Sequence, residues 1–547
     1  MKRSRLLIVL LLIAAGAAFM FSKEGNTPEK GDGKDTVEQS ITFALHSIPD
    51  SVDPGVTSET YAGPILNNAF EGLVTYDSEN NIIPGNAEKW ELSEDGLTYT
   101  FHLRPNLKWS DGSALNAHDF VYSWLRVITP ETGSLYADQL LPYVVGAKDF
   151  FDGKASADEV GLKALDDNTL EVKLITPTPF FLGLLATYTF CPVQKATVEA
   201  NGEKWTLSEN TYVSNGPFKV TKINFNESYE FEKNENYWNA ENVKLQKLKF
   251  VFIPESATAL TAFRAGDIDG FWEVPTSDLP TLRAESDELS TVRAFGTTFH
   301  IFNNAKPPFD NPLVRKAFNL AIDRKALIED VLGTNDTPAY SLIAPGYVTD
   351  GVDVTEGRST YGMEPGAQPE KAREALAEAG YPDGKGFPEI EYYYSTNDTF
   401  KKTVEALTAM LTDNLGIKIK LKTADWAVYY ADVKAGRYQL GQYGWGGDYL
   451  HPMTFLPLLV TKGVNNYTGY SNPKYDELVA RIQNTIDQET AIGLMREAED
   501  TLMKDYPMLP LFFRSYSYMM RKTTAGYFRT PLNNLYFRDA YVEAPGK

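Results

Sequence analysis

Hydrophobic and polar positions alternate with period two in several stretches of the chain. Ile41–Leu45 follows this pattern, and Tyr99, Phe101 and Leu103 alternate with polar neighbours, so both stretches are predicted strands. Residues 65–70 instead show the apolar spacing of a helix, and Asp53-Pro54 interrupts the chain before them. The folded part of the chain is therefore expected to begin near residue 41.

The carboxy-terminal half repeats helical patterns followed by strand patterns. Asn311-Pro312 predicts a helix start, and a helix from Lys401 that stops at Gly416 precedes a fully alternating strand over 417–423. Further predicted elements are helices over 370–379, 475–486 and 490–504, strands over 248–252 and 508–520, and two short strands within 161–175. This order predicts an α/β architecture with mixed sheets.

The length of the chain indicates how many lobes to expect, and its net charge indicates which classes of ligand it can bind. At 547 residues the chain is too long for one core, so two or three lobes are expected. Its 31 Tyr, 30 Phe and 8 Trp indicate amphipathic walls around an internal site as well as core. A net charge of −21 argues against nucleic acid or an anionic membrane as a partner and suits neutral or cationic ligands.

The amino-terminal segment, residues 1–21, is predicted to be an export signal. Three basic residues precede an apolar run of 16 residues from Leu6 to Phe21. Gly16-Ala17-Ala18 is a possible cleavage zone, but the apolar run continues past it, so an uncleaved anchor stays open as the alternative. Residues 22–40 are polar and are expected to form a disordered linker. We expect an extracytoplasmic location, in the periplasm or at the outer face of the cell membrane.

The only cysteine of the sequence is Cys191. A lone cysteine excludes an internal disulfide, and its apolar context favours buried packing. No cysteine stands near residue 20, so attachment of a lipid to a cysteine there is not expected.

The stretch 441–459, GQYGWGGDYLHPMTFLPLL, is the strongest candidate for a ligand site. Its glycines allow a ligand to approach the backbone, Trp445 offers a flat apolar wall, and Asp448 is a carboxylate that can receive a ligand ammonium. The alternative is a glycine-rich turn with a solvated aspartate, and the stretch alone does not decide between the two.

Signals for catalysis are weak. The five histidines are scattered, none is paired at i,i+4, and Asp448 with His451 lacks a third metal ligand nearby. No nucleophile elbow, phosphate loop or dinucleotide fingerprint is present. We therefore expect a binding protein without catalytic residues, metal or cofactor. A secreted hydrolase that uses a carboxylate pair is the alternative from a different class, because the sequence holds 73 acidic residues.

Several motifs resemble those of one family. They are Tyr-Thr-Phe-x-Leu-Arg and Lys-Trp-Ser-Asp-Gly within 90–124, NGPFKV at 215–220, RAGDIDG at 264–270, FNNAKPPFDNPLVRKAFNLAIDR at 302–324, the stretch 441–459 and TPLNNLYFRDAYV at 530–542. With these motifs the chain resembles extracellular solute-binding proteins of the peptide and nickel class, the receptors of ABC importers, and is most similar to the oligopeptide-binding branch. The resemblance covers residues 41–543.

The resemblance implies a periplasmic-binding-protein-like clamp of type II, class C, with mixed sheets. Lobe I is expected over 41–70, 192–296 and 510–543, an inserted lobe II over 71–191, and lobe III over 297–509. The chain is expected to cross the hinge twice, near Gly296 and near Pro510, and to close around a ligand by hinge motion. The implied partners are an oligopeptide and the permease subunits of an ABC transporter, and a monomer is expected.

The resemblance also implies roles for individual residues. An extended peptide is expected to pair with two segments of the protein, Ser58–Thr60 and Gly444–Gly446. Asp448 matches the aspartate that holds the amino terminus of the peptide. Trp445 and Trp426 match aromatic positions that line side-chain pockets, as does Tyr136 less closely. For Trp426 and Tyr136, ordinary core packing is an equally good interpretation.

The sequence departs from the family where relatives bind the peptide carboxylate with a Lys, an Arg and a His. Lys306 keeps its charge, whereas Gln442 replaces the Arg and Phe400 replaces the His. Lys306 is either a carboxylate partner or a solvated surface charge. The loss of two cationic groups predicts longer peptides, peptides with the carboxylate elsewhere, an apolar ligand end against Phe400, or a non-peptide ligand. A role in reporting peptides to a sensor, instead of import, also stays open.

Overall fold

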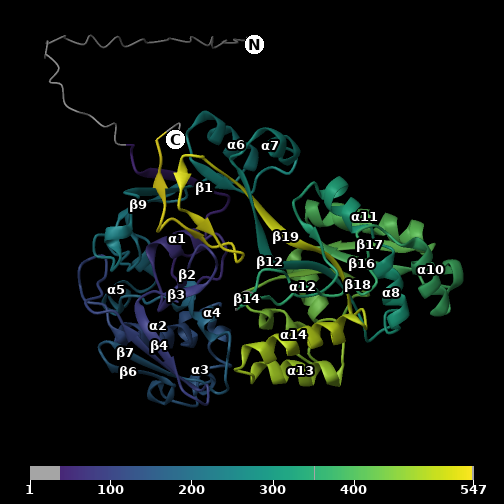
Figure 1. The fold of residues 1–547 in the computed structure, drawn as a ribbon, viewed down its shortest axis with the longest axis horizontal. Coiled ribbons are helices and arrows are strands. Elements are labelled where there is room, and N and C mark those ends of the chain that lie inside the picture. The colour runs from purple at the N-terminus through teal and green to yellow at the C-terminus, as the bar shows by residue number, and fades with distance from the viewer. Residues whose placement is uncertain (1–36, 350–351, 545–547) are drawn as a thin grey trace, which may run out of the picture. The chain divides into compact units, whose positions relative to one another are not determined.

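The computed structural model describes residues 37–349 and 352–544, and its largest element is a mixed sheet of 11 strands (Figure 1). The order across the sheet is β17 (Ile419–Ala424), β16 (Ile390–Ser395), β18 (Leu440–Gly446), β12 (Leu289–Phe302), β19 (Met508–Met520), β11 (Gly270–Trp272), β1 (Ser40–Leu45), β10 (Lys247–Phe252), β9 (Ser228–Lys233) and β8 (Phe218–Asn224), with β13 (Thr337–Pro338) on β19. Parallel and antiparallel pairs both occur, as the sequence predicts.

Two long antiparallel strands, β12 and β19, lie at the centre of this sheet. Their pairing has register shifts between Arg293 and Thr297 and between Thr298 and Phe299. The first shift contains Gly296, and at the second the partner residue changes from Phe512 to Pro510. Both predicted hinge crossings thus lie at irregularities of the ladder, where a strand bends more easily. The hinge motion itself stays a prediction.

A second sheet of four strands lies within the predicted lobe II. It has the order β4 (Ala87–Leu92), β5 (Thr98–Leu103), β7 (Thr169–Lys173) and β6 (Leu162–Asp166). The inward side chains of β5 are Tyr99, Phe101 and Leu103, as their alternation predicts. Asn116 caps helix α2 (Ala117–Val127), and the Asp119 side chain completes the capping box.

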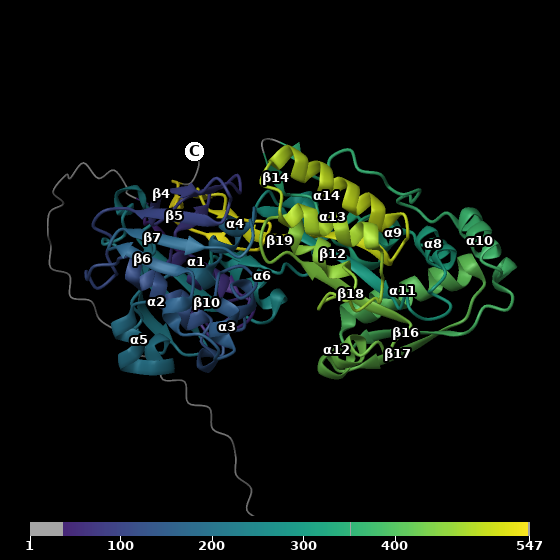
Figure 2. The same cartoon turned by 90° about the horizontal axis from the view of Figure 1, so that it is seen from below.

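The predicted helices of the carboxy-terminal half are also present, with ends that differ by one to three residues. Asn311 accepts a hydrogen bond from Leu313 N at the start of α8, and Gly416 ends α11 in the left-handed conformation. Their bounds are α8 (Pro312–Leu320), α10 (Pro369–Glu378), α11 (Asp398–Leu415), α13 (Pro473–Gln483) and α14 (Gln488–Met503), of which α13 and α14 lie side by side (Figure 2). Other helices are α1 (Gly63–Ala69), α3 (Ala147–Phe151), α4 (Phe181–Leu185), α5 (Lys195–Asn201), α6 (Ser256–Ala265), α7 (Leu279–Glu285), α9 (Arg324–Ala326) and α12 (Trp426–Lys434).

The described residues from Gln39 onward form one compact unit, so the division of this unit into three lobes at the predicted boundaries stays a proposal. Cys191 is buried in its core, which agrees with the packing role expected from the sequence. Within the described residues, no helix has the length and apolar composition needed to cross a membrane. The predicted export signal and most of the predicted linker lie outside the described residues.

Candidate functional site

Strand β18 exposes one edge of its backbone. It pairs along its length with β12, from Leu440 with Phe302 to Gly446 with Gly296. On the other edge β16 pairs only with Leu440 and Gly441, and no other described strand continues the ladder. The backbone from residue 443 to residue 446 is therefore open on one side, as a strand edge that accepts an added strand must be.

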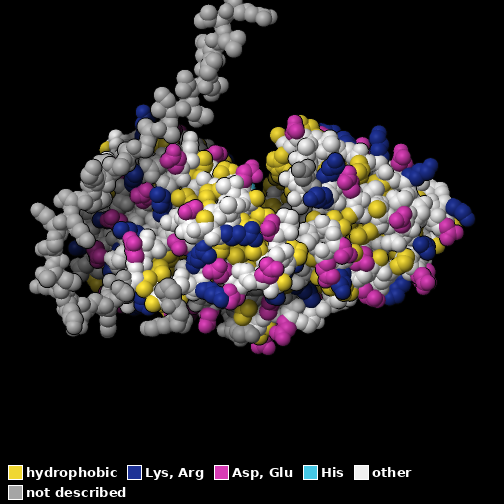
Figure 3. All heavy atoms as spheres, turned by 90° about the horizontal axis from the view of Figure 1, so that it is seen from above, with side chains coloured by type: hydrophobic (Ala, Val, Ile, Leu, Met, Phe, Trp, Pro, Cys, Tyr) yellow, Lys and Arg dark blue, Asp and Glu magenta, His cyan; other side chains and the backbone are white. Residues whose placement is uncertain are grey.

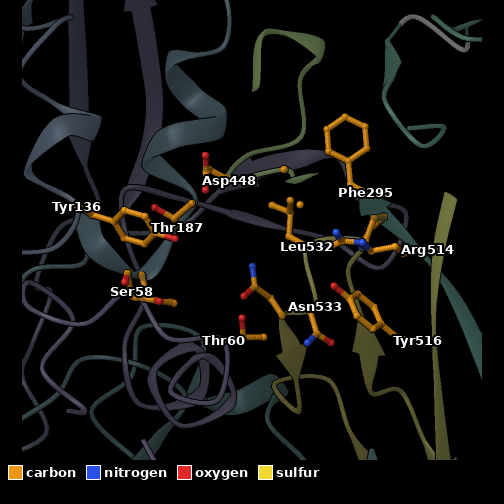
Figure 4. A pocket seen from close by; sticks show the side chains of 15 residues that line it. Ser58, Thr60, Tyr136, Thr187, Phe295, Asp448, Arg514, Tyr516, Leu532 and Asn533 are labelled. Atoms are coloured by element: carbon orange, nitrogen blue, oxygen red, sulfur yellow. The ribbon is translucent and has the colours of Figure 1, made fainter. Parts of the chain in front are cut away.

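A cavity of about 240 Å³ lies at the end of this open edge. It receives residues from β18 and its following turn, from the loop before α1 and from β19 (Figure 4). Its lining residues are Ser58, Thr60, Tyr136, Thr187, Tyr188, Phe295, Gly446, Gly447, Asp448, Arg514, Tyr516 and residues 531–534. We call it the acidic cavity because of Asp448. It brings together five of the predicted site residues: Ser58, Thr60, Tyr136, Gly446 and Asp448.

A second cavity of about 540 Å³ follows the same strand in the opposite direction, and we call it the aromatic cavity. It is lined by Thr298, His300, Leu332, Thr334, Asp336, Thr399, Phe400, Thr403, Trp426, Tyr430, residues 442–445, Phe512 and residues 514–516. Five further predicted residues therefore meet here: Phe400, Trp426, Gln442, Gly444 and Trp445. Arg514 and Tyr516 line both cavities, so the two spaces adjoin. Figure 3 shows a hollow in one face of the molecule, with hydrophobic side chains along its edges.

Lys306 is the one predicted site residue that lines neither cavity. Its side chain is exposed, and the ammonium donates a hydrogen bond to the Gly436 carbonyl at 2.7 Å. The structure therefore favours the surface-charge interpretation of this lysine over a role beside Gln442 and Phe400.

The Asp448 carboxylate lacks a cationic partner among the described residues. Burial raises its pKa to about 6, and the nearby Asp138 carboxylate adds to the rise, whereas a hydrogen bond with Thr454 opposes it. The Thr454 hydroxyl also accepts hydrogen bonds from Asp448 N at 3.1 Å and from Trp445 Nε1 at 3.2 Å. Asp448 is thus held beside the cavity with an unbalanced negative charge, which a ligand cation would balance.

Aromatic side chains form one wall of the aromatic cavity. Trp426 is 54% exposed and stacks on Tyr430, with ring centroids 5.3 Å apart. This exposure decides against core packing for Trp426. Tyr136 is half-buried in the acidic cavity, where burial and the negative charge of Asp448 raise its pKa. It too lies at the site and not in the core.

Buried Asp53 positions the loop that contains Ser58 and Thr60. Its carboxylate accepts hydrogen bonds from Arg126 Nη1 at 2.9 Å and Nη2 at 2.6 Å, and from Trp205 Nε1 at 2.7 Å. The same carboxylate accepts from Gly55 N at 3.0 Å. The three bonds from Arg126 and Trp205 anchor the loop to α2 and to the core behind it, and the bond from Gly55 N holds the turn at Asp53.

The histidines near the site have structural roles. His451 is buried and its Nδ1 accepts from Met453 N at 3.2 Å, while burial lowers its pKa to about 3. Buried His300 lines the aromatic cavity and contacts the Tyr392 hydroxyl. In residues 37–349 and 352–544, no group of three His, Cys, Asp or Glu side chains is arranged to hold a metal ion.

Sequence reasoning missed Arg514 and Tyr516, which lie on β19 and face both cavities. A signal was present, because Arg514 is the only charged residue in the strand MLPLFFRSYSYMM. Asn533, Asn534 and Thr187 also line the acidic cavity without having been predicted.

Residues 81–467 match the model of the bacterial extracellular solute-binding proteins, family 5. The chain belongs to this family. Membership confirms the predicted family and the prediction of a binding protein instead of an enzyme.

Individual relatives match the solute-binding chain over almost its whole length. The oligopeptide-binding protein OppA of Bacillus subtilis is 33% identical, with 98% of each chain covered. The probable deoxycholate-binding periplasmic protein YgiS of Escherichia coli is 31% identical, with 100% of each chain covered. The crystal structure of Haemophilus influenzae OppA in complex with the peptide RPPGFSPFR is 33% identical, with 93% of this chain and 100% of that chain covered, at a TM-score of 0.74. The predicted mixed α/β fold of a periplasmic binding protein is thereby confirmed.

Proposed function

We propose that this solute-binding protein captures oligopeptides outside the cytoplasm and delivers them to the permease subunits of an ABC importer. The observation that carries the proposal is the open backbone edge of β18 beside the unbalanced carboxylate of Asp448. An extended peptide is a ligand that uses both features, because its backbone pairs with a strand edge and its amino terminus is a cation. The peptide-binding relatives support the choice of ligand.

In this proposal each part of the site has a role. Gly444–Gly446 and Ser58–Thr60 pair with the ligand backbone, and Asp448 receives its ammonium group. Side chains of the peptide enter the aromatic cavity, where Trp426 and Trp445 provide apolar contact. Backbone pairing makes recognition tolerant of sequence, which suits a receptor for mixed peptides. The three predicted lobes and the two hinge crossings supply the closure.

Native mass spectrometry of the purified protein tests this function. A receptor for mixed peptides is expected to carry a heterogeneous set of masses that fragment as peptides. A spectrum with no bound mass, together with turnover of a chromogenic glycoside or ester, would show that the hydrolase interpretation is the correct one. The same spectrum detects dimers, which would contradict the expected monomer.

A second candidate is a receptor for a non-peptide ligand with an apolar body. The aromatic cavity is more than twice the volume of the acidic one and has apolar walls, and one relative is named as a deoxycholate-binding protein. A single bound mass that does not fragment as a peptide would favour this candidate.

Loss of signalling without loss of peptide uptake in a deletion strain would favour a sensor role.

Peptide binding is expected to weaken as the pH falls through 6. The pKa of Asp448 is about 6, so most of its carboxylate is ionised at pH 7 and about a tenth at pH 5. The amino terminus of the peptide stays protonated over this range. The Kd of a peptide with a free amino terminus should therefore rise about tenfold from pH 7 to pH 5 in titration calorimetry. An N-acetylated peptide is the control, since its affinity should not follow this titration.

A further inference from the structure

Arg514 is a partly buried cation at the boundary between the two cavities. Among the described residues, its guanidinium makes one hydrogen bond, from Nε to the Thr298 hydroxyl at 2.9 Å, and no ion pair. Burial lowers its pKa, which means that the surroundings disfavour the charged form. Neither terminal nitrogen of the guanidinium has a hydrogen-bond partner among the described residues.

Two buried arginines of this chain, Arg324 and Arg529, have partners for their charge within the protein. Arg324 donates to the carbonyls of Ala339, Pro510 and Asn319. The guanidinium of Arg529 lies over the Trp272 and Tyr516 rings, each 4.8 Å from its centre. Arg529 also lines a cavity, and its Nε and Nη1 have no hydrogen-bond partner, but these rings lie against its charge. Among the described residues Arg514 has no such ring contact, and it lines both cavities of the site. A partly buried cation that lines a cavity and has no ion-pair partner is typical of a ligand-binding group.

Asp336 is the nearby carboxylate that acts on Arg514, but its own oxygens are occupied. They accept hydrogen bonds from Ser515 N at 2.7 Å, Ser515 Oγ at 3.1 Å and Thr334 Oγ1 at 2.7 Å. Among the described residues Asp336 and Arg514 form no ion pair, but the negative charge of Asp336 raises the pKa of Arg514. The negative charge of Asp336 therefore helps to keep Arg514 protonated without filling the donors of its guanidinium.

Glycine at position 444 makes room for the guanidinium. A Cβ at Gly444 would overlap Arg514 Nη2, and one at Gly446 would lie 3.9 Å from Nη1. Because a Cβ points out of the plane of the sheet, the guanidinium lies over the face of β18 at Gly444. The open edge of the same strand, where the proposed peptide backbone would run, is next to it. In Figure 4 Arg514 reaches the acidic cavity from β19, while Asp448 enters from the turn after β18.

We propose that Arg514 binds a carboxylate of the ligand, so that the acidic cavity takes a ligand with an ammonium group at Asp448 and a carboxylate at Arg514. This inference rests on the proposed function and names the ligand class: short peptides with a free carboxy terminus, or peptides with an acidic side chain near the amino terminus. Arg514 replaces, from a different strand, the cations that are absent at Gln442 and Phe400. A guanidinium also binds a carboxylate through two parallel hydrogen bonds, which an exposed lysine such as Lys306 does not.

Titration calorimetry with paired peptides tests the assignment. The probes are alanine peptides of two to five residues, each as the free acid and as the carboxy-terminal amide, together with Ala-Glu-Ala-amide and Ala-Gln-Ala-amide. In at least one of these pairs, the wild-type protein is expected to bind the peptide with the carboxylate with a Kd about 10- to 100-fold lower than that of its amide or Gln counterpart. The alanine peptides report on a carboxy terminus, and the Glu and Gln pair reports on an acidic side chain.

Arg514→Gln is expected to abolish this preference, and the matched control Lys306→Gln is expected to keep it. Arg514→Lys should keep part of it, because the charge stays but the paired donors are lost. This conservative variant, with the wild-type comparison, decides the question even where Arg514→Gln does not fold. Equal binding of acid and amide forms by the wild type, or an unchanged preference in Arg514→Gln, would overturn the assignment. Absence of any bound peptide in native mass spectrometry would instead overturn the proposed function.

Discussion

Replacement of Asp448 by Asn is expected to weaken the binding of peptides with a free amino terminus by about 2–4 kcal/mol, or roughly 30- to 1,000-fold in Kd. Asn has the same shape but no charge, so the ligand ammonium would lie in the acidic cavity without its anion. Titration calorimetry with one peptide and its N-acetylated form measures the effect. The acetylated form should lose little affinity. Equal losses for both forms would contradict the assigned role of Asp448.

The same variant has a second measurable consequence, in the unliganded protein. The raised pKa of Asp448 means that folding disfavours its ionised form, so its contribution to stability falls as the pH rises through 6. Removal of the charge should therefore raise the thermal unfolding midpoint at pH 7 without ligand. Opposite changes in stability and affinity distinguish a ligand-binding carboxylate from one that stabilises the fold.

Replacement of Asp53 by Ala is expected to destabilise the protein by about 3–5 kcal/mol in urea unfolding. The change leaves the Arg126 guanidinium buried without its anion and removes the acceptor of Trp205 Nε1. The loop with Ser58 and Thr60 would lose its anchor, so peptide affinity should fall as well.

Asp152→Ala is the matched control for this stability measurement. Asp152 pairs with two lysines, Lys148 and Lys154, but at the surface, where solvent screens the interaction. Its removal should leave the urea midpoint almost unchanged. Equal midpoints for the Asp53 and Asp152 variants would show that the Asp53 cluster does not hold the loop.

Local patterns predicted much of the fold. The alternation around Tyr99 and the helix start at Asn311 depend on neighbours in the sequence, and both were confirmed. The strand over residues 508–520 has the predicted ends. In contrast, the local pattern from Gly441 indicated only glycines that admit a ligand, and the pairing of Gly444–Gly446 was implied by the resemblance. The first six residues of this stretch lie in the regular strand β18. The edge of β18 is open because β16 pairs only with Leu440 and Gly441. No local sequence pattern predicts where that pairing stops.

Site residues were predictable only in part, for the same reason. Asp448 stands out because it is a lone carboxylate among glycines and aromatics. Arg514 reaches the site because β12 and β19 pair across more than 200 residues of sequence. Lys306 was placed by resemblance, but its loop turns the ammonium toward Gly436. Tertiary pairing therefore decided which cation lines the two cavities.

The register shifts of β12 and β19 have a mechanical consequence for ligand capture. Phe295 and Thr298 on β12, and Arg514 and Tyr516 on β19, all touch a cavity and lie within a few residues of these shifts. The two strands stay hydrogen-bonded on both sides of the shifts. A clamp of this construction would close by elastic bending of the paired strands β12 and β19 at these shifts. The bound ligand would then stabilise the bent, closed conformation, and its release would let the strands return to the open conformation.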